Sequence, residues 1–359
     1  AKISFQSGTF DIKAWHIHNF QNYEVAQYVN GELFVPKSEN LCEFVIFHRS
    51  GVKTPDFVQR VANQNLHATQ GSEWVLIYPD TLKNQAQKLA NLRKNQFEVA
   101  TFTLESILDE FGGGRKDPTA IRNFSRMLHE RSPSYKYLLL MGDATYDVRN
   151  IQNENASHLH IPVYQTKNSL HPVLAFPSDD YYGLLSNGEG GDLIGSLEVA
   201  VGRLPVRNTM EANNVVNKII NYDTNTNKFG PWRSHVILSA DDEDGNLHVI
   251  QADRLAQRIE QNTPEFLVFK KYLDAYNQIS TPAGQRYPNV NFEINNAMNQ
   301  GALAFCYLGH GGPSGLAEER VVQVGDIMSW QNMHNLPVMV TATCSFTGFD
   351  NPKNVSAGE

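Results

Sequence analysis

The feature that most constrains the fold is a regular alternation of short apolar runs and amphipathic segments between about residues 73 and 343. The apolar runs include EWVLIYP (73–79), KYLLLMGD (136–143), ALAFCYLG (302–309) and LPVMVTATC (336–344). A strand that is buried on both faces is apolar throughout, and an intervening helix supplies the crossover to the next parallel strand. The pattern therefore predicts an α/β protein built from βαβ units with parallel-rich sheets.

The alternation falls into two series, preceded by a different kind of sequence. Residues 1–55 alternate apolar and polar positions and contain few helix formers, which predicts a β-rich N-terminal segment. Residues 56–225 are then expected to form one α/β subdomain and residues 226–359 a second, with a linker beginning near residue 225. The chain ends at SAGE (356–359) without a closing element, so we expect the second subdomain to be truncated at its C-terminal end.

Composition excludes several classes of function. The net charge is -8, whereas phosphate binding needs a basic face, so no nucleic-acid partner is expected. No run of about 18 apolar residues is present that would span a bilayer. The three cysteines, Cys42, Cys306 and Cys344, are too few and too widely spaced for a disulfide framework or a CxxC metal site. Cys42 and Cys306 have apolar neighbours and are expected to pack in a core.

Two of the apolar runs end in residues that can carry chemistry. ALAFCYLG leads directly into His310 and Gly311, and PVMVTAT leads directly into Cys344. The segment between them is long enough for one loop, one helix and one returning strand, so a right-handed crossover would bring both strand ends to the same edge of one sheet. We therefore expect the strands at 303–308 and 337–343 to be parallel and to lie adjacent or next but one, with His310 near Cys344.

This pair suits nucleophilic catalysis. A free thiol is little ionised at neutral pH, and a neighbouring imidazolium favours the thiolate and can later protonate a leaving amine. The backbone N–H groups of Gly311 and Cys344 are candidate oxyanion donors for the acyl intermediate. The alternative is that Cys344 is a small buried side chain and His310 an ordinary loop residue.

The motifs around the pair resemble those of the gingipain family of cysteine peptidases. YLGHGG, TATC, FDNP and SAGE carry the resemblance, together with the upstream blocks GDATYD, PSDDYYG, VGRLPV and EANNVVNKIINYD, so that it extends from about residue 56 onward. The resemblance implies a caspase-like catalytic unit in which His310 is the base and Cys344 the nucleophile. Within the family, the blocks are most similar to the sortases of type IX secretion. That similarity implies an exported enzyme on the extracellular face of the outer membrane, acting with other secretion-machinery proteins. Such an enzyme would remove C-terminal signals from cargo proteins and transfer the acyl group to a lipopolysaccharide amine.

The resemblance also implies roles for several acidic residues. Glu198 would hold the far nitrogen of His310, and Glu211 would line the pocket for the P1 side chain, the residue on the N-terminal side of the scissile bond. Because gingipains bind calcium, the loop that contains Asp241, Asp242 and Asp244 is a candidate calcium site, although the reaction itself requires no cofactor. The alternatives are that Glu198 points to solvent, that Glu211 only stabilises a helix N-terminus, and that the acidic loop is a solvated turn.

Two other functions are compatible with the sequence. One is a secreted gingipain-like protease with a basic P1 preference, which an acidic Glu211 would favour. The other is a catalytically inactive scaffold domain of the secretion machinery, which the presence of both His310 and Cys344 disfavours.

Overall fold

A computed structural model of the chain describes most of its residues and divides them into two compact units. The described residues are 2–4, 12–19, 22–35, 37, 41–57, 60–152, 160–168, 171, 173–226 and 229–359. One unit comprises Ala1–Asn63 and the other Gln64–Glu359.

The N-terminal unit is β-rich, as predicted. It contains two antiparallel three-stranded sheets, with strand orders β1-β5-β4 and β3-β2-β6. Leu33 and Ala14, one in each sheet, are buried. The strand bounds are β1 (Lys2–Ser4), β2 (Ile12–Asn19), β3 (Asn22–Val25), β4 (Tyr28–Val29), β5 (Glu32–Phe34) and β6 (Glu43–His48).

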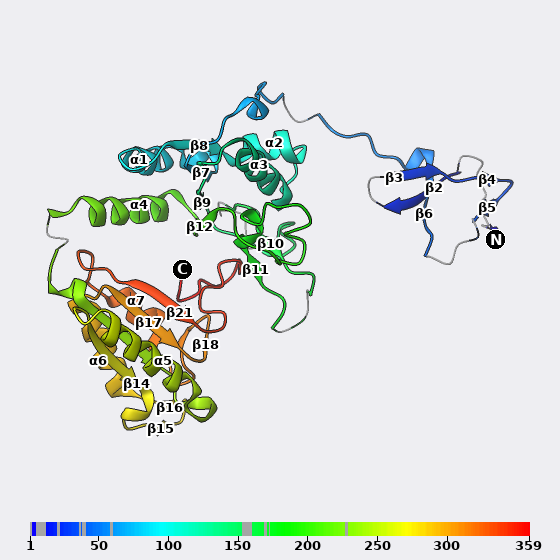
Figure 1. Ribbon diagram of the computed structural model, residues 1–359. Coiled ribbons are helices and arrows are strands. Elements are labelled where there is room, and N and C mark those ends of the chain that lie inside the picture. The colour runs from blue at the N-terminus through cyan, green and yellow to red at the C-terminus, as the bar shows by residue number, and fades with distance from the viewer. Residues whose placement is uncertain are drawn as a thin grey trace. The chain divides into compact units, whose positions relative to one another are not determined.

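The second unit contains two parallel sheets, of which the first has the strand order β12-β9-β7-β8 (Figure 1). Every residue of the central strand β7 is buried: Trp74 and Leu76 belong to the core beneath α1 and α4, whereas Val75 and Ile77 belong to the core beneath α2 and α3. The bounds are β7 (Trp74–Tyr78), α1 (Lys83–Arg93), β8 (Val99–Thr103), α2 (Leu104–Gly112), α3 (Pro118–Arg131), β9 (Tyr137–Met141), β12 (Ala200–Leu204) and α4 (Thr209–Thr224).

The helices of this sheet begin at residues with recognisable capping chemistry. Asp117 accepts a hydrogen bond from the backbone N–H of Thr119, and Pro118 occupies the first turn of α3, where a missing N–H costs nothing. Asn208 likewise accepts from the N–H of Glu211 at the start of α4.

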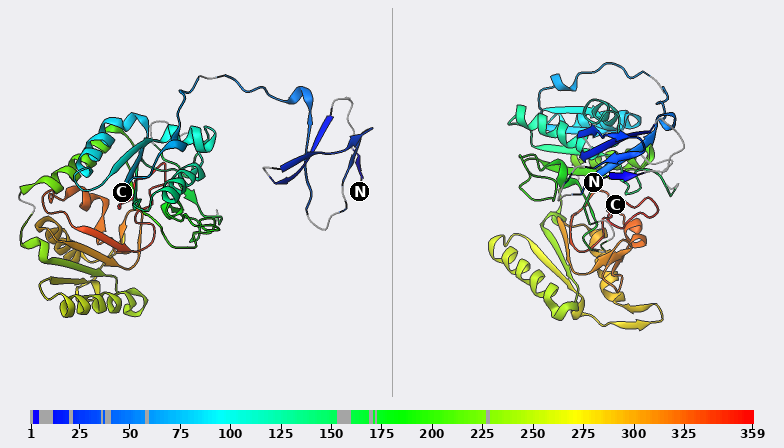
Figure 2. Two further views of the ribbon diagram at one scale, coloured as in Figure 1. Left: turned by 45° about the horizontal axis from the view of Figure 1, so that its top comes forward. Right: turned by 90° about the vertical axis from the view of Figure 1, so that its right-hand side faces the viewer.

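The second sheet has the strand order β14-β13-β17-β21 and is also parallel, which confirms the predicted α/β class and the predicted neighbouring strands. Helices cover both of its faces (Figure 2). Phe305 and Tyr307 of β17 pack in the core with α6, whereas Ala304 and Cys306 face the core with α5. The bounds are β13 (His235–Ala240), α5 (Glu243–Asn262), β14 (Leu267–Tyr272), α6 (Pro288–Gln300), β17 (Ala304–Leu308), α7 (Val324–Ser329) and β21 (Val338–Ala342).

Smaller elements connect these layers. None of the helices that the structure describes is both long enough and apolar enough to span a membrane. The short strands are β10 (Tyr164–Gln165), β11 (Pro177–Ser178), β15 (Ile279–Thr281), β16 (Gly284–Arg286), β18 (Gly311–Gly312), β19 (Gly315–Leu316) and β20 (Val322–Gln323). The 3-10 helices are η1 (Arg49–Gly51), η2 (Leu66–Ala68), η3 (Asp80–Leu82), η4 (Asp179–Tyr182), η6 (Pro231–Ser234) and η7 (Leu273–Ala275).

Candidate active site

Three neighbouring strands of the second sheet end at the same edge, and each is followed by a residue with reactive or titratable chemistry. Ala240 of β13, Leu308 of β17 and Ala342 of β21 are aligned across the sheet. Asp241 follows the first of these strands directly, whereas His310 and Cys344 each lie two residues beyond the other two. The carboxyl edge of the sheet therefore brings together a carboxylate, an imidazole and a thiol, which is where ligands bind in open parallel sheets.

The pairing of β17 with β21 continues past the ends of the strands. The N–H of Gly309 donates to the carbonyl of Ala342 (3.2 Å). The backbone of Gly311 then lies so close to Thr343 that a Cβ on this glycine would be 2.4 Å from the Thr343 Oγ1 atom. The chain segments that carry His310 and Cys344 are therefore in direct contact.

Cys344 is exposed at the carboxyl edge of the second sheet, whereas Cys306 is half-buried within β17. The residue after it, Ser345, has a φ of 49°, in the left-handed region that residues other than glycine seldom occupy. The chain thus turns sharply immediately after the thiol, and Cys344 stands at the end of its strand rather than inside a continuing one.

The imidazole of His310 is fixed by Asp241. The same carboxylate oxygen, Oδ2, accepts a hydrogen bond from the His310 backbone N–H (3.0 Å) and lies 3.1 Å from Nδ1 of the ring. The phenol of Tyr307 and the N–H of Ala317 both donate to the His310 carbonyl, at 2.7 and 2.9 Å. Ring and backbone are thus both held, and Nε2 is the ring nitrogen left for chemistry.

Asp241 is itself rigidly placed. It is fully buried, its other oxygen accepts from the N–H of Glu243 (2.9 Å), and its own N–H donates to the carbonyl of Leu308 (3.1 Å). Desolvation lowers the pKa of His310, but the hydrogen bond and charge of Asp241, with further negative charge from Asp244 and Glu243, outweigh it and hold the pKa above its ordinary value.

The two predicted oxyanion donors lie beside this pair. In the antiparallel pairing of β18 with β19, Gly311 is opposite Leu316, and the N–H of Ala317 donates to His310. Hydrogen-bonded positions alternate along such a pair, so the N–H of Gly311 points away from β19. No carbonyl among the described residues accepts from the Cys344 N–H. Both groups can therefore donate to a ligand.

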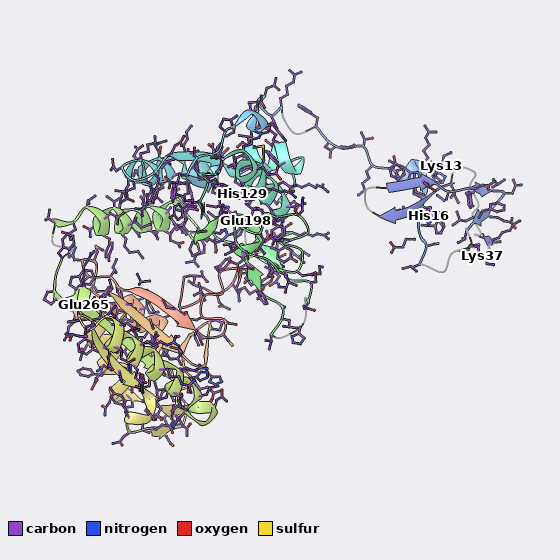
Figure 3. The ribbon with its side chains drawn as sticks, viewed as in Figure 1. Lys13, His16, Lys37, His129, Glu198 and Glu265 are labelled. Atoms are coloured by element: carbon purple, nitrogen blue, oxygen red, sulfur yellow. The ribbon has the colours of Figure 1, made fainter. Side chains whose placement is uncertain are left out.

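The structure does not bring Glu198 to His310, so this part of the prediction is corrected. Glu198 accepts hydrogen bonds from the Leu185 N–H (2.7 Å) and the Ser186 hydroxyl (2.5 Å), and Figure 3 shows it close to His129. The physical reason is its position in the sheet. Glu198 precedes β12 (Ala200–Leu204), so it lies at the amino edge of the first sheet, not at a carboxyl edge.

Glu211 lies at the N-terminus of α4, where its carboxylate is already occupied. It accepts from the backbone and guanidinium of Arg207 and from the Asn208 side chain. Although desolvation raises the pKa of Glu211, these hydrogen bonds and the Arg207 charge outweigh it and lower the pKa. The alternative that Glu211 stabilises a helix N-terminus matches these contacts.

The three aspartates predicted to bind calcium point in different directions. Asp241 holds His310, Asp242 accepts from the Tyr287 phenol (2.6 Å), and Asp244 Oδ2 lies 3.5 Å from Nε2 of His310. Calcium requires six to eight oxygen ligands, whereas the three-residue groups that the described chain offers both include an imidazole. The geometry does not fit calcium at this loop, and calcium binding elsewhere stays a prediction.

A cleft of about 810 Å³ opens next to Ser345, the residue after the thiol. It is lined by residues that are distant in the sequence, including Tyr146, Phe176 and Phe349. Among the described lining residues only Asp350 is charged, and its carboxylate accepts from the Gln165 amide (2.8 Å). The cleft is therefore aromatic and mostly uncharged.

The residue that sequence reasoning missed is Asp241 as the partner of His310. The signal was present, since Asp241 directly follows the buried run HVILSA in the same way that Cys344 follows PVMVTAT. Applying the strand-end rule to a third strand would have found it.

Comparisons with known proteins identify structures with a similar fold. The structure is similar to dimeric latent PorU from Porphyromonas gingivalis, with a TM-score of 0.50 and 24% identity over 62% of this chain and 24% of that one. It is also similar to the Arg-specific cysteine proteinase gingipain R (RgpB), with a TM-score of 0.55 and 17% identity over 75% of this chain and 54% of that one. The chain thus spans about a quarter to a half of these structures, and no curated protein matches it.

These likenesses establish the caspase-like α/β fold of the gingipains. The model of peptidase family C25, the gingipain family, matches residues 67–359, which is most of the chain. The chain therefore belongs to peptidase family C25, the gingipain family of cysteine peptidases.

Proposed function

We propose that this chain is an endopeptidase in which Cys344 is the nucleophile, His310 the general acid and base, and Asp241 the residue that positions His310. The observation that supports the proposal is the alignment of the carboxyl ends of β13, β17 and β21, because Asp241, His310 and Cys344 follow these three neighbouring strands. A cysteine peptidase uses a thiol, an imidazole and a group that orients the imidazole.

The reaction uses Nε2 of His310, the ring nitrogen that Asp241 does not hold. The Cys344 thiolate adds to the carbonyl carbon of the scissile bond, and the carbonyl oxygen becomes an oxyanion that the N–H groups of Gly311 and Cys344 would bind. The C–N bond then breaks while Nε2 of His310 gives its proton to the leaving amine. A thioester remains, and water or an amine attacks it, returns a proton to Nε2 and releases the thiolate.

Asp241 supports this cycle from behind the ring. Because its carboxylate faces Nδ1 at 3.1 Å, it fixes the ring orientation and favours the imidazolium that the thiolate requires. Its burial excludes water from this side, so the interaction is stronger than it would be at the surface.

For the substrate we propose the sortase function: removal of a C-terminal secretion signal from cargo proteins and transfer of the new acyl end to a lipopolysaccharide amine. Support comes from the sequence blocks GDATYD and ATCSFTGFDNP and from the structural likeness to PorU. The proposed location is the extracellular face of the outer membrane, where cargo, acceptor amine and other secretion-machinery proteins would meet the enzyme.

The contacts of Glu211 and the lining of the cleft disfavour a basic P1 preference. Arg207 already neutralises Glu211, and the described cleft residues include one carboxylate, Asp350, which accepts a hydrogen bond from the neutral amide of Gln165. Because most of the lining is aromatic or amide, small or uncharged P1 residues are favoured.

The test compares Cys344→Ala with Cys306→Ala, which removes the other thiol of the second sheet, in the full-length protein. Cleavage of a cargo protein that carries its C-terminal signal should be lost in Cys344→Ala and retained in Cys306→Ala. Adding a primary amine to the active enzyme should give an amide product that mass spectrometry detects. Unimpaired cleavage by Cys344→Ala would overturn the peptidase assignment, whereas acid as the sole product would overturn acyl transfer alone.

A further inference from the structure

Two side chains that the proposed reaction does not use lie beside Nε2 of His310, the nitrogen that carries the proton in that reaction. Asp244 and His248 lie in the segment that follows β13, and Oδ2 of Asp244 is 3.5 Å from Nε2 of His310 and 3.5 Å from Nε2 of His248. The two imidazole rings are nearly perpendicular, with centroids 5.4 Å apart. The three ligand atoms all lie within 4.8 Å of one another.

These separations have the size that a tetrahedral metal ion requires. Zinc binds imidazole nitrogen and carboxylate oxygen at about 2.0–2.2 Å, so two of its tetrahedral ligands lie about 3.4 Å apart. The two 3.5 Å separations are close to this value and long for hydrogen bonds. The two imidazole nitrogens lie within 4.8 Å of each other, so a side-chain movement of about 1 Å would let the three atoms surround an ion.

The ligand types and their surroundings also suit zinc. Two imidazoles and one carboxylate form a frequent three-ligand zinc set that leaves one position open. A metal-bound histidine usually gives its other ring nitrogen to a carboxylate, and Asp241 is placed in this way behind Nδ1 of His310. Access is open as well, because the side chains of Asp244 and His310 are 57% and 41% exposed.

We propose that His310, His248 and Asp244 form a zinc site, with water in the fourth position, and that zinc binding there switches the peptidase off. The inhibition follows because zinc and the reacting proton would compete for the same atom, Nε2 of His310. The site itself needs neither Cys344 nor a substrate. It rests on the proposed function only in so far as His310 is the general base.

The binding test uses the chain with Cys344→Ala, because this background removes the thiol that could otherwise bind zinc together with His310. Isothermal titration with Zn²⁺ should give one site, and Co²⁺ should give the visible absorption of a tetrahedral complex. His248→Ala should weaken binding about tenfold or more, since even the loss of an outer partner costs that much. Asp244→Asn should act in the same direction. The exposed His334 supplies the matched control, and His334→Ala should leave binding unchanged.

The activity test uses the chain with its thiol intact. His248→Ala should cleave peptides like the parent in a chelating buffer but should lose most of its sensitivity to added Zn²⁺. Equal zinc inhibition of parent and His248→Ala would overturn the proposal, because it would place the ion on Cys344 and His310 instead. Zinc binding that His248→Ala leaves unchanged, or no binding to the Cys344→Ala chain, would overturn it too. Because the titration needs no turnover, failure of the proposed peptidase function would leave this result readable.

Discussion

At the scale of single residues, the site depends on which partner each polar atom has. The backbone N–H and the Nδ1 atom of His310 both contact one buried oxygen of Asp241, so Nε2 is the ring nitrogen that faces other side chains. The same carboxylate keeps the ring charged to higher pH, since its charge raises the pKa of His310 against the effect of desolvation. Asp241 therefore determines both the orientation and the charge state of the His310 ring.

Asp241→Asn should show the effect of the Asp241 charge on the pH dependence of turnover. The substitution removes the charge that raises the pKa of His310, so the imidazolium is lost at lower pH and the alkaline limb of the kcat/KM profile should move downward. We expect kcat/KM near neutral pH to fall about 100-fold. The profile is measured with a fluorogenic peptide in a buffer that contains a chelator.

Glu243→Gln is the matched control for this prediction. Glu243 lies 3.9 Å from Nδ1 of His310 and is 43% exposed, so its charge is screened and the shift should be smaller and in the same direction. An alkaline limb that Asp241→Asn leaves in place would show that the carboxylate does not support the imidazolium.

Gly311→Ala should impair the enzyme through Thr343. A Cβ at residue 311 would meet the Thr343 Oγ1 atom at 2.4 Å, so the segment that leads into Cys344 would have to move. Removal of one oxyanion donor typically costs about 100-fold or more in kcat, and we expect a loss of about tenfold or more from this displacement. Steady-state kinetics on the purified variants measures it.

Gly312→Ala and a double variant separate this contact from the general loss of a glycine. A Cβ at Gly312 would meet no atom within 4 Å, so Gly312→Ala should keep near-parent activity. Thr343→Ala removes the atoms that clash, so it should partly rescue Gly311→Ala. An equal loss in both glycine variants would contradict the contact as the cause.

At the scale of elements, the sequence predicted where β17 and β21 end better than it predicted the place of Glu198, whose role was assigned from a family resemblance. The runs ALAFCYLG and PVMVTATC predicted two parallel neighbours, which β17 and β21 are. Burial on both faces was expected for both strands, but β21 is an edge strand on which Val338 and Val340 are exposed. Glu198 was assigned from its place beside the VGRLPV motif, which says nothing about which edge of the sheet it occupies. It precedes β12, so no crossover could bring it to the carboxyl edge.

The loop after β13 shows a second limit of sequence reasoning. Its acidic composition indicated a cation site, but the contact of Asp244 with His248 and His310 depends on the local path of the backbone. Asp244, Gly245 and Asn246 have φ values of 54°, 64° and 63°, three successive left-handed residues that no periodicity would have predicted. Only the structure shows which aspartate faces which histidine.

The central position of β17 gives a prediction about stability. Phe305 is fully buried in the core with α6, so Phe305→Ala should lower the free energy of unfolding by about 3–5 kcal/mol. Val340 of the edge strand β21 is 55% exposed, so Val340→Ala should change it by less than about 1 kcal/mol. Urea unfolding followed by fluorescence measures both values. Similar losses in the two variants would argue against the observed core.

At the scale of the whole molecule, the segment after Cys344 joins the two sheets of the larger unit. Asp350 accepts hydrogen bonds from the Tyr146 N–H (3.0 Å) and from the Gln165 side chain (2.8 Å), both of which lie between β9 and β12 of the first sheet. Arg203 of β12 lies with its guanidinium carbon 5.2 Å from the centre of the Phe349 ring. The cleft beside Ser345 is therefore built from segments connected to both sheets, and its shape depends on the contact between these segments.

Arg203→Met should test this connection, because Arg203 is the buried cation at the junction. Its guanidinium binds both oxygens of Asp179 (2.7 and 2.8 Å) and the carbonyl of Gly142 (3.0 Å), and its side chain is only 5% exposed. Removing it leaves a carboxylate without its partner, so the free energy of unfolding should fall by about 3–5 kcal/mol, measured by urea titration. Arg126→Met breaks the more exposed pair with Glu130 and should cost less than about 1 kcal/mol.

Because Arg203 also stacks on Phe349, peptide cleavage by Arg203→Met should show a raised KM at temperatures where this variant remains folded. An unchanged KM would mean that the subdomains keep the cleft in shape without this residue.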